Sequence, residues 1–141
     1  MIAALFLALW ISPASAAPSP KTEASRAASA EYLRGTLLEH RGAYVAALAA
    51  YAKAMELDPS AAFIAGEAAE LALKLEDRPR AEIWARKRLE LAPGDVKSRV
   101  ILGRVLWSRG DVEGAEAEFG RASKTDPSSA ETLFALTGLI E

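Results

Sequence analysis

The side chains of this chain that could do chemistry are few, and they are not grouped. The chain has no cysteine, and His40 is its one histidine. It therefore has no disulfide, no thiolate metal site, no cysteine nucleophile and no site with several histidine ligands. Catalysis by His40 would need a partnered nucleophile or a second base, and no sequence pattern supplies one. His40 fits instead the C-terminus of a helix, where a positive side chain interacts favourably with the helix dipole. The sequence predicts no catalytic residues, no metal and no cofactor.

A basic run is the other chemically distinctive group. Arg86, Lys87 and Arg88 are consecutive, and Arg78 and Arg80 lie just before them. Such a cluster can bind an acidic partner or a phosphate-bearing surface, but a solvated helix face explains it more simply. The whole chain carries 17 basic and 19 acidic residues, a net charge of −2. This balance argues against a nucleic-acid-binding protein, which usually presents a basic face to phosphates.

The composition favours closely packed helices. The chain has 141 residues, enough for one domain, and 31 of them are alanine, whereas aromatic residues make up only 7%. Alanine loses the least side-chain entropy in a helix, so this composition favours helix over sheet.

The first sixteen residues have the pattern of a signal peptide. An apolar run extends from Ile2 to Ile11, and Pro13 and the small residues Ala14-Ser15-Ala16 follow it. Ten apolar residues are too few to cross a membrane, which needs about 20. The pattern predicts export to the periplasm or the medium, with cleavage after Ala16. No Lys or Arg precedes Lys21, so either the true start lies further upstream, or the segment is an atypical signal or a short membrane anchor.

A regular period organises the rest of the chain. Pro59, Pro93 and Pro127 recur at an interval of about 34 residues, which indicates stacked repeats. Two sets of small residues follow the same period: Gly35, Ala69 and Gly103, and Ala47, Ala81 and Ala115. A glycine inside a helix costs about 1 kcal/mol, so we expect the first set to allow close approach of a paired helix at the second set. The period predicts helices near 29–41, 44–57, 61–75, 79–91, 95–108, 112–124 and 129–140.

The turns between these helices have their own signals. Gly42 and Gly110 suit the left-handed residue that ends a helix, and Asp77 or Asp111 can then cap the next one. Pro79 suits the first turn of a helix, where its missing N–H leaves no bond unmade.

The chain resembles the tetratricopeptide repeat (TPR) family, and the third repeat carries the resemblance best, through Leu102, Gly103, Leu106, Gly110, Ala115, Phe119, Ala122 and Pro127. The second repeat departs from the pattern, with Ala85 for the aromatic residue and Arg88 for a small one. The resemblance implies an all-α, right-handed solenoid of antiparallel helix hairpins. The expected segments are a signal peptide (1–16), a flexible leader (17–28), three repeats (28–61, 62–95, 96–129) and an extra helix (130–141).

The resemblance also implies a concave groove that binds proteins or peptides. By the family's geometry, its residues here are Tyr32, Thr36, Glu39, Glu70, Leu73, Lys74, Lys97, Val100, Arg104 and Trp107, although Trp107 could equally be packed as core. Some family members hold the terminal carboxylate of a chaperone peptide with Asn and Lys or Arg side chains. This chain has no asparagine, which argues against that activity.

These patterns predict an exported, non-catalytic scaffold that holds other proteins together, plausibly during assembly of the cell envelope. The alternative is a fragment or regulatory half of a larger protein whose activity lies in a missing C-terminal part; an enzyme is a distant third. The apolar last helix, with Leu133, Phe134 and Leu136, would have one face uncovered, so it could dock on a partner or on a second copy. Membrane contact is expected only through an uncleaved N-terminal segment.

Overall fold

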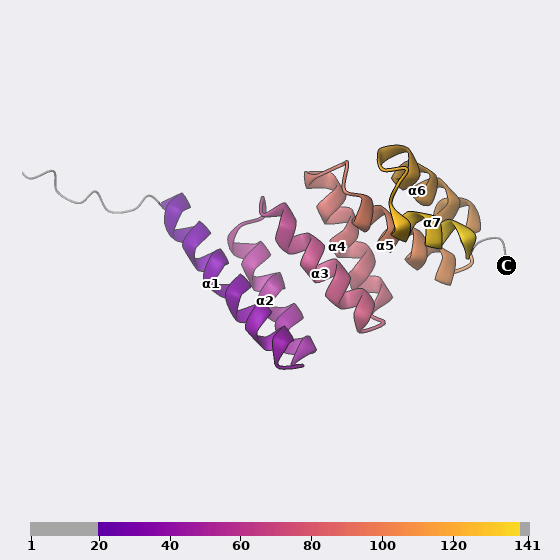
Figure 1. Ribbon diagram of the computed structural model, residues 1–141. Coiled ribbons are helices and arrows are strands. Elements are labelled where there is room, and N and C mark those ends of the chain that lie inside the picture. Colours follow the sequence, from indigo (N-terminus) through magenta and orange to yellow (C-terminus); the bar gives the residue numbers. More distant parts are fainter. Residues whose placement is uncertain (1–19, 139–141) are drawn as a thin grey trace, which may run out of the picture.

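A computed structural model describes residues 20–138 of the chain (Figure 1). The predicted signal peptide and residues 139–141 lie outside this part. The described residues form seven helices and no strand: α1 (Pro20–His40), α2 (Tyr44–Leu57), α3 (Ala62–Lys74), α4 (Arg78–Leu91), α5 (Val96–Ser108), α6 (Val112–Thr125) and α7 (Ala130–Thr137). From α2 to α6 these bounds agree with the predicted ones within one residue at each end.

The helix α1 corrects the predicted flexible leader. It begins at Pro20, so residues 20–28 are helical, and Ala28 is only 2% exposed. The physical reason lies in the composition of this stretch, whose alanine, lysine, glutamate and arginine residues favour helix. Glu23 also lies in the first turn, where a negative charge complements the helix dipole. Residues 17–19 lie outside the described part.

The turn signals behave as predicted. Gly42 and Gly110 have φ angles of 77° and 81°. Glu76 stands at the equivalent place in the second hairpin with φ 57°, in the left-handed region that glycine tolerates best. The Asp77 side chain accepts a hydrogen bond from the Arg80 N–H, and that of Asp111 accepts one from the Gly114 N–H. Both aspartates therefore cap the helices that follow them.

Each hairpin has a first helix (α1, α3 or α5) and a second helix (α2, α4 or α6). The glycines in two of the first helices make room for aromatic rings, which corrects the predicted close approach of a helix at the alanine of the second helix. A Cβ atom on Gly103 would lie within 2.8 Å of three ring carbons of Phe119, and one on Gly35 would lie 2.5 Å from the Tyr51 ring. The carbonyl oxygen of Ala47 is 3.3 Å from the same point. The ring lies one turn beyond the expected alanine, so it is the ring that requires the glycine.

In the second hairpin, two alanines replace the glycine and the aromatic ring that pack together in the other hairpins. Ala69 stands where the other hairpins have glycine, and Ala85 stands where they have Tyr51 and Phe119. Both alanines are fully buried. The absence of the ring removes the need for the glycine, which explains why these two positions change together.

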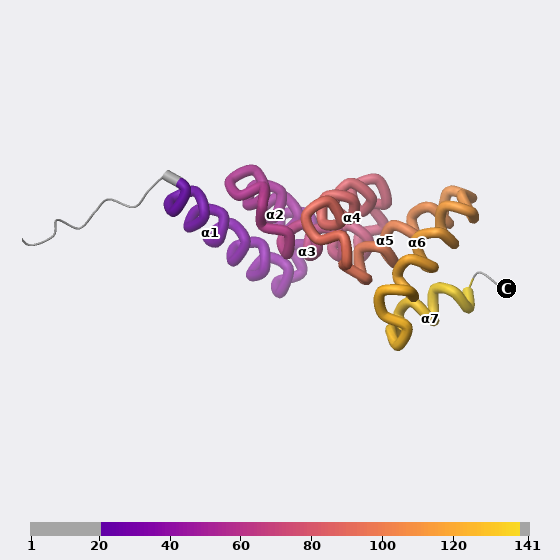
Figure 2. Tube along the Cα trace, turned by 90° about the horizontal axis from the view of Figure 1, so that it is seen from above, coloured from indigo at the N-terminus to yellow at the C-terminus, as the bar shows by residue number. Residues whose placement is uncertain are grey.

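The hairpins stack in chain order from one end of the molecule to the other (Figures 1 and 2). Each first helix packs on its own second helix, and α3 contacts α5, which in turn contacts α7. One buried cluster extends from α2 to α5 and a smaller one surrounds Phe119 between α5, α6 and α7. The helices α1, α3, α5 and α7 therefore share one surface, here named the first-helix face.

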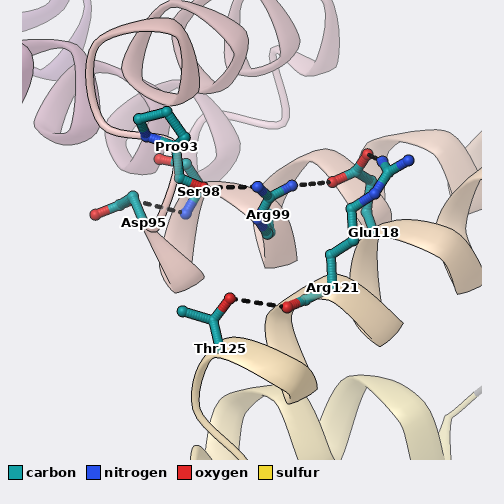
Figure 3. A network of polar contacts seen from close by, with 7 residues as sticks. All are labelled: Pro93, Asp95, Ser98, Arg99, Glu118, Arg121 and Thr125. Carbon is teal, nitrogen blue, oxygen red and sulfur yellow. Dashed lines mark hydrogen bonds and ion pairs between the residues drawn. The ribbon is translucent and has the colours of Figure 1, made fainter.

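A buried polar network joins α5 to α6 (Figure 3). Arg99 lies 3.1 Å from Glu118, a carboxylate that is only 8% exposed and that Arg121 also contacts. A second guanidinium nitrogen of Arg99 donates to the Pro93 carbonyl at 2.6 Å. The pairing compensates for the burial of Glu118, since an unpaired buried charge would be strongly destabilising.

Candidate functional site

Aromatic side chains form the N-terminal part of the first-helix face. Tyr32 on α1 stacks on Tyr51, with ring centroids 5.7 Å apart. Tyr32 and Phe63 make an edge-to-face contact, with ring centroids 5.0 Å apart. Phe63, on α3, is 51% exposed. The sequence prediction included Tyr32 but missed Phe63, which lies just inside the start of α3. Phe63 stands one repeat period before Lys97, which the prediction did include, so the period alone could have found this position.

Two predicted groove residues on α1 mainly support this aromatic cluster. The Tyr51 hydroxyl donates a hydrogen bond of 2.9 Å to Glu39. Burial, together with the negative charge of Glu39, raises the pKa of Tyr51 to about 12. Thr36 donates to the Tyr32 carbonyl oxygen at 3.1 Å. Glu39 and Thr36 thus already have partners within the protein.

Charged side chains occupy the middle of the face. Lys97 lies 3.2 Å from Glu70, and this carboxylate raises the pKa of Lys97. Partial burial, with the negative charges of Glu70 and Glu39, raises the pKa of Glu67. Lys74 lies 4.1 Å from the centroid of the Tyr44 ring, a cation–π contact. Glu67 was missed by the sequence prediction, although it lies one turn before Glu70.

The basic run is divided among several partners. Arg86 pairs with Glu82 at 2.7 Å and Lys87 with Glu90 at 3.3 Å, both within α4. Arg88 points elsewhere and pairs with Asp95 at 3.0 Å. The hydrogen bonds from Arg88 and Ser98 outweigh the effect of burial and hold the pKa of Asp95 below its usual value. Each of the three consecutive basic residues is therefore paired with a carboxylate.

An apolar groove lies at the C-terminal part of the face, between α5 and α7. Its volume is about 550 Å³, and it is here named the C-terminal groove. Val100 and Phe119 are buried and form its floor, whereas Phe134 on α7 is 83% exposed. The residues that line it are Val100, Arg104, Trp107, Ser108, Phe119, Glu131, Phe134, Ala135 and Gly138.

Arg104 is the notable charge in this groove. It lies on α5 one turn after Val100 and one turn before Trp107, so all three share one side of the helix. Arg104 is exposed, and within residues 20–138 no carboxylate lies within 4.0 Å of its guanidinium. A cation beside an apolar groove can pair with a carboxylate that a ligand brings.

The predicted groove residues thus separate into three groups along one face. Tyr32, Thr36 and Glu39 belong to the aromatic part, and Glu70, Lys74 and Lys97 to the charged part. Arg104 and Trp107 line the C-terminal groove. Trp107 is half-buried and lies against Gly138, so it serves both as packing and as a groove wall. Phe134 was not among the predicted groove residues, although it stands one repeat period after Val100.

The described residues contain no group of three or more His, Asp or Glu side chains that could hold a metal ion. In the same part of the chain, no helix is both long enough and apolar enough to cross a membrane.

Comparison with known proteins gives structural matches only. No family model and no curated protein sequence matches the chain. The Arabidopsis OM64 TPR domain superposes with a TM-score of 0.76 over 82% of this chain and 96% of that domain, at 20% identity. The chain has the fold of a TPR domain. The predicted all-α solenoid of helix hairpins is therefore confirmed.

Two further TPR domains with the same fold were solved with peptides. The first TPR of Spaghetti (RPAP3), bound to the HSP90 peptide SRMEEVD, matches with a TM-score of 0.75 and 21% identity, over 82% of this chain and 92% of that one. The second TPR domain of human RPAP3, in complex with the HSP70 peptide SGPTIEEVD, matches with a TM-score of 0.74 and 17% identity, over 86% and 98%. At these identities the similarity to TPR domains concerns the fold.

Proposed function

We propose that the chain is a non-catalytic interaction module that binds a peptide segment of a partner protein along the first-helix face. The observation that carries this proposal is the C-terminal groove, where the half-buried Trp107 and the exposed Phe134 line an apolar surface beside Arg104, a cation without an ion pair among the described residues. Aromatic and arginine side chains contribute much of the binding energy at protein interfaces. The peptide complexes of structurally similar TPR domains support the same assignment.

This chain lacks residues that chaperone-binding TPR domains use to hold their peptides. The resemblance to chaperone-binding TPR domains would require asparagine side chains around the peptide carboxylate, and this chain contains none. The first-helix face offers instead an aromatic part, a charged middle and an apolar groove. We therefore propose a partner that is not a chaperone C-terminus.

Substitution in the C-terminal groove tests the binding proposal. The partner is first recovered from a cell-envelope extract by crosslinking to the full chain. We then expect Trp107→Ala and Arg104→Ala each to weaken its binding tenfold or more, because each removes a side chain that faces the groove. Titration calorimetry with the recovered partner gives the affinities, and circular dichroism checks the helices.

Matched substitutions outside the face serve as controls for this experiment. Ile83→Ala removes an exposed apolar side chain from α4, and Lys124→Ala removes an exposed cation from α6. Both should leave the affinity within twofold. Binding that survives both groove substitutions but fails with Arg86→Ala and Lys87→Ala would move the site to α4 and contradict the proposal. Loss of helix in Trp107→Ala would show that this ring is core.

We also propose that the protein is exported and works as a scaffold among envelope proteins. The support is the apolar run from Ile2 to Ile11 followed by Ala14-Ser15-Ala16. We expect the exported protein to begin at Ala17, and N-terminal sequencing checks this. An intact Met1 on protein from the soluble cytoplasmic fraction would contradict export, and an intact Met1 in the membrane fraction would favour the anchor.

A further inference from the structure

We infer that the segment bound in the C-terminal groove is a peptide that combines a bulky apolar side chain with an acidic residue. The apolar side chain enters between Trp107 and Phe134, and the carboxylate pairs with Arg104. This inference rests on the proposed function and names the chemistry of the partner, which the fold alone leaves open.

The apolar half of the inference follows from the walls of the groove. Val100 and Phe119 close its floor, and Trp107 and Phe134 stand on opposite helices, α5 and α7. Phe134 exposes 83% of its surface, the largest exposed fraction among the large apolar side chains of the described residues. A bulky apolar side chain from a ligand would remove both rings from water, and apolar burial is the main driving force of association.

The acidic half follows from the charges around the groove. Lys74, Lys97 and Arg104 line the C-terminal groove and the surface that adjoins it, together with the carboxylates of Glu70 and Glu131. Glu67, which lies beside Glu70 and also acts on Lys97, balances these charges, so the inference depends on which cation lacks a partner. Lys97 is paired with Glu70, and Glu131 also acts on Lys97. Among residues 20–138, Arg104 has no carboxylate within 4.0 Å of its guanidinium, so it is the cation that can bind a carboxylate of the ligand.

The shape of the groove favours a peptide over a free fatty acid, which would also join an apolar group to a carboxylate. The wall formed by Phe134 is largely exposed to solvent, so a long acyl chain would stay partly in water. A peptide that lies along the first helices can cover this wall from outside and bring its carboxylate to α5.

The test starts from a displayed library of random twelve-residue peptides selected on the full chain. We expect the enriched peptides to carry Phe, Trp, Leu or Ile within four residues of Asp or Glu. A fluorescent copy of the most enriched peptide should bind Phe134→Ala and Arg104→Glu at least tenfold more weakly than the parent, by fluorescence anisotropy. Arg26→Glu, the same charge change on α1, should leave the affinity within twofold.

A charge exchange makes the test specific to Arg104. Replacing the acidic residue of the peptide by lysine should weaken binding to the parent and restore at least part of the binding to Arg104→Glu. Phe134 is exposed, so its substitution should leave the circular dichroism spectrum unchanged. These two results together would support both halves of the inference.

Other results would overturn the inference in distinguishable ways. Enriched peptides that depend on Tyr32 or Phe63, but not on Arg104 and Phe134, would leave the proposed function standing and refute the groove assignment. If no enriched peptide depended on any residue of the first-helix face, both the proposed function and the groove assignment would be refuted. Laurate that bound to the groove in place of peptide would make the ligand a lipid. Dimers in sedimentation velocity that Phe134→Ala abolishes would assign the groove to a second copy.

Discussion

We expect Gly103→Leu to lower the free energy of unfolding by about 2–3 kcal/mol. Any Cβ at this position would overlap the ring of Phe119, which is fully buried between α5 and α6. Overpacking of a core typically costs about 1–3 kcal/mol and occasionally more. Because a whole leucine side chain would meet a fully buried ring, we expect a cost at or just above the top of this range, from which the better helix propensity of leucine subtracts up to about 1 kcal/mol. Thermal unfolding followed by circular dichroism should show a fall in Tm of roughly 10 °C.

Two further variants separate overpacking from a general effect of changing glycine. Gly120 lies in α6 with open space where a Cβ atom would be, so Gly120→Ala should stabilise the protein by up to about 1 kcal/mol. Gly103→Ala combined with Phe119→Ala recreates the alanine pair of the second hairpin, Ala69 and Ala85. The double variant should lose less stability than the sum of its single changes. A Tm of Gly103→Leu equal to that of the parent would refute the close packing of this ring.

Replacement of Glu118 should have an effect of similar size. Glu118→Gln removes the charge that pairs with Arg99, whose side chain is only 18% exposed. The guanidinium would keep the Pro93 carbonyl but lose its counter-charge. Breaking a buried ion pair costs about 3–5 kcal/mol, and because Arg121 and part of Arg99 reach solvent we expect about 3 kcal/mol here. Urea denaturation measures the loss.

Glu116→Gln is the matched control for this change. Glu116 lies on the same helix, is exposed and has no ion pair within the described residues, so its substitution should alter stability by less than about 0.5 kcal/mol. Equal losses in the two variants would mean that the network between α5 and α6 contributes no specific stability.

The fold was predictable because its signals are local and repeated. Prolines that recur at the repeat period, helix-ending glycines such as Gly42 and capping aspartates such as Asp77 each specify the backbone near them, whatever the distant packing. The partner of Gly103 was not predictable in the same way. The period shows that a small residue recurs, but two buried positions one turn apart, Ala115 and Phe119, could face it. Only the packed structure shows that Phe119 does.

The candidate site was predictable in its place but less so in its members. The family resemblance put the groove residues on the first helices, and all of them lie on α1, α3 and α5. It could not show that Glu39 is engaged by Tyr51, because this contact depends on how deeply the ring enters the hairpin. Phe63 and Phe134 were not assigned to the groove, although they stand one repeat period before Lys97 and after Val100, two residues that were assigned to it. Single departures from a repeat are where specificity is expected.

The helix α7 forms one wall of the C-terminal groove, yet little holds it in place. It spans eight residues, of which Thr132 is the one buried residue among those described. Its main contacts are with α5 and α6. Elements with so few buried contacts open with a small free energy, well below that of global unfolding. A ligand that binds the closed wall must therefore shift this local equilibrium, and part of its intrinsic affinity is spent on ordering α7. Backbone amides of α7 would then report occupancy of the groove through slower hydrogen exchange, while those of α2 to α4 stay unchanged.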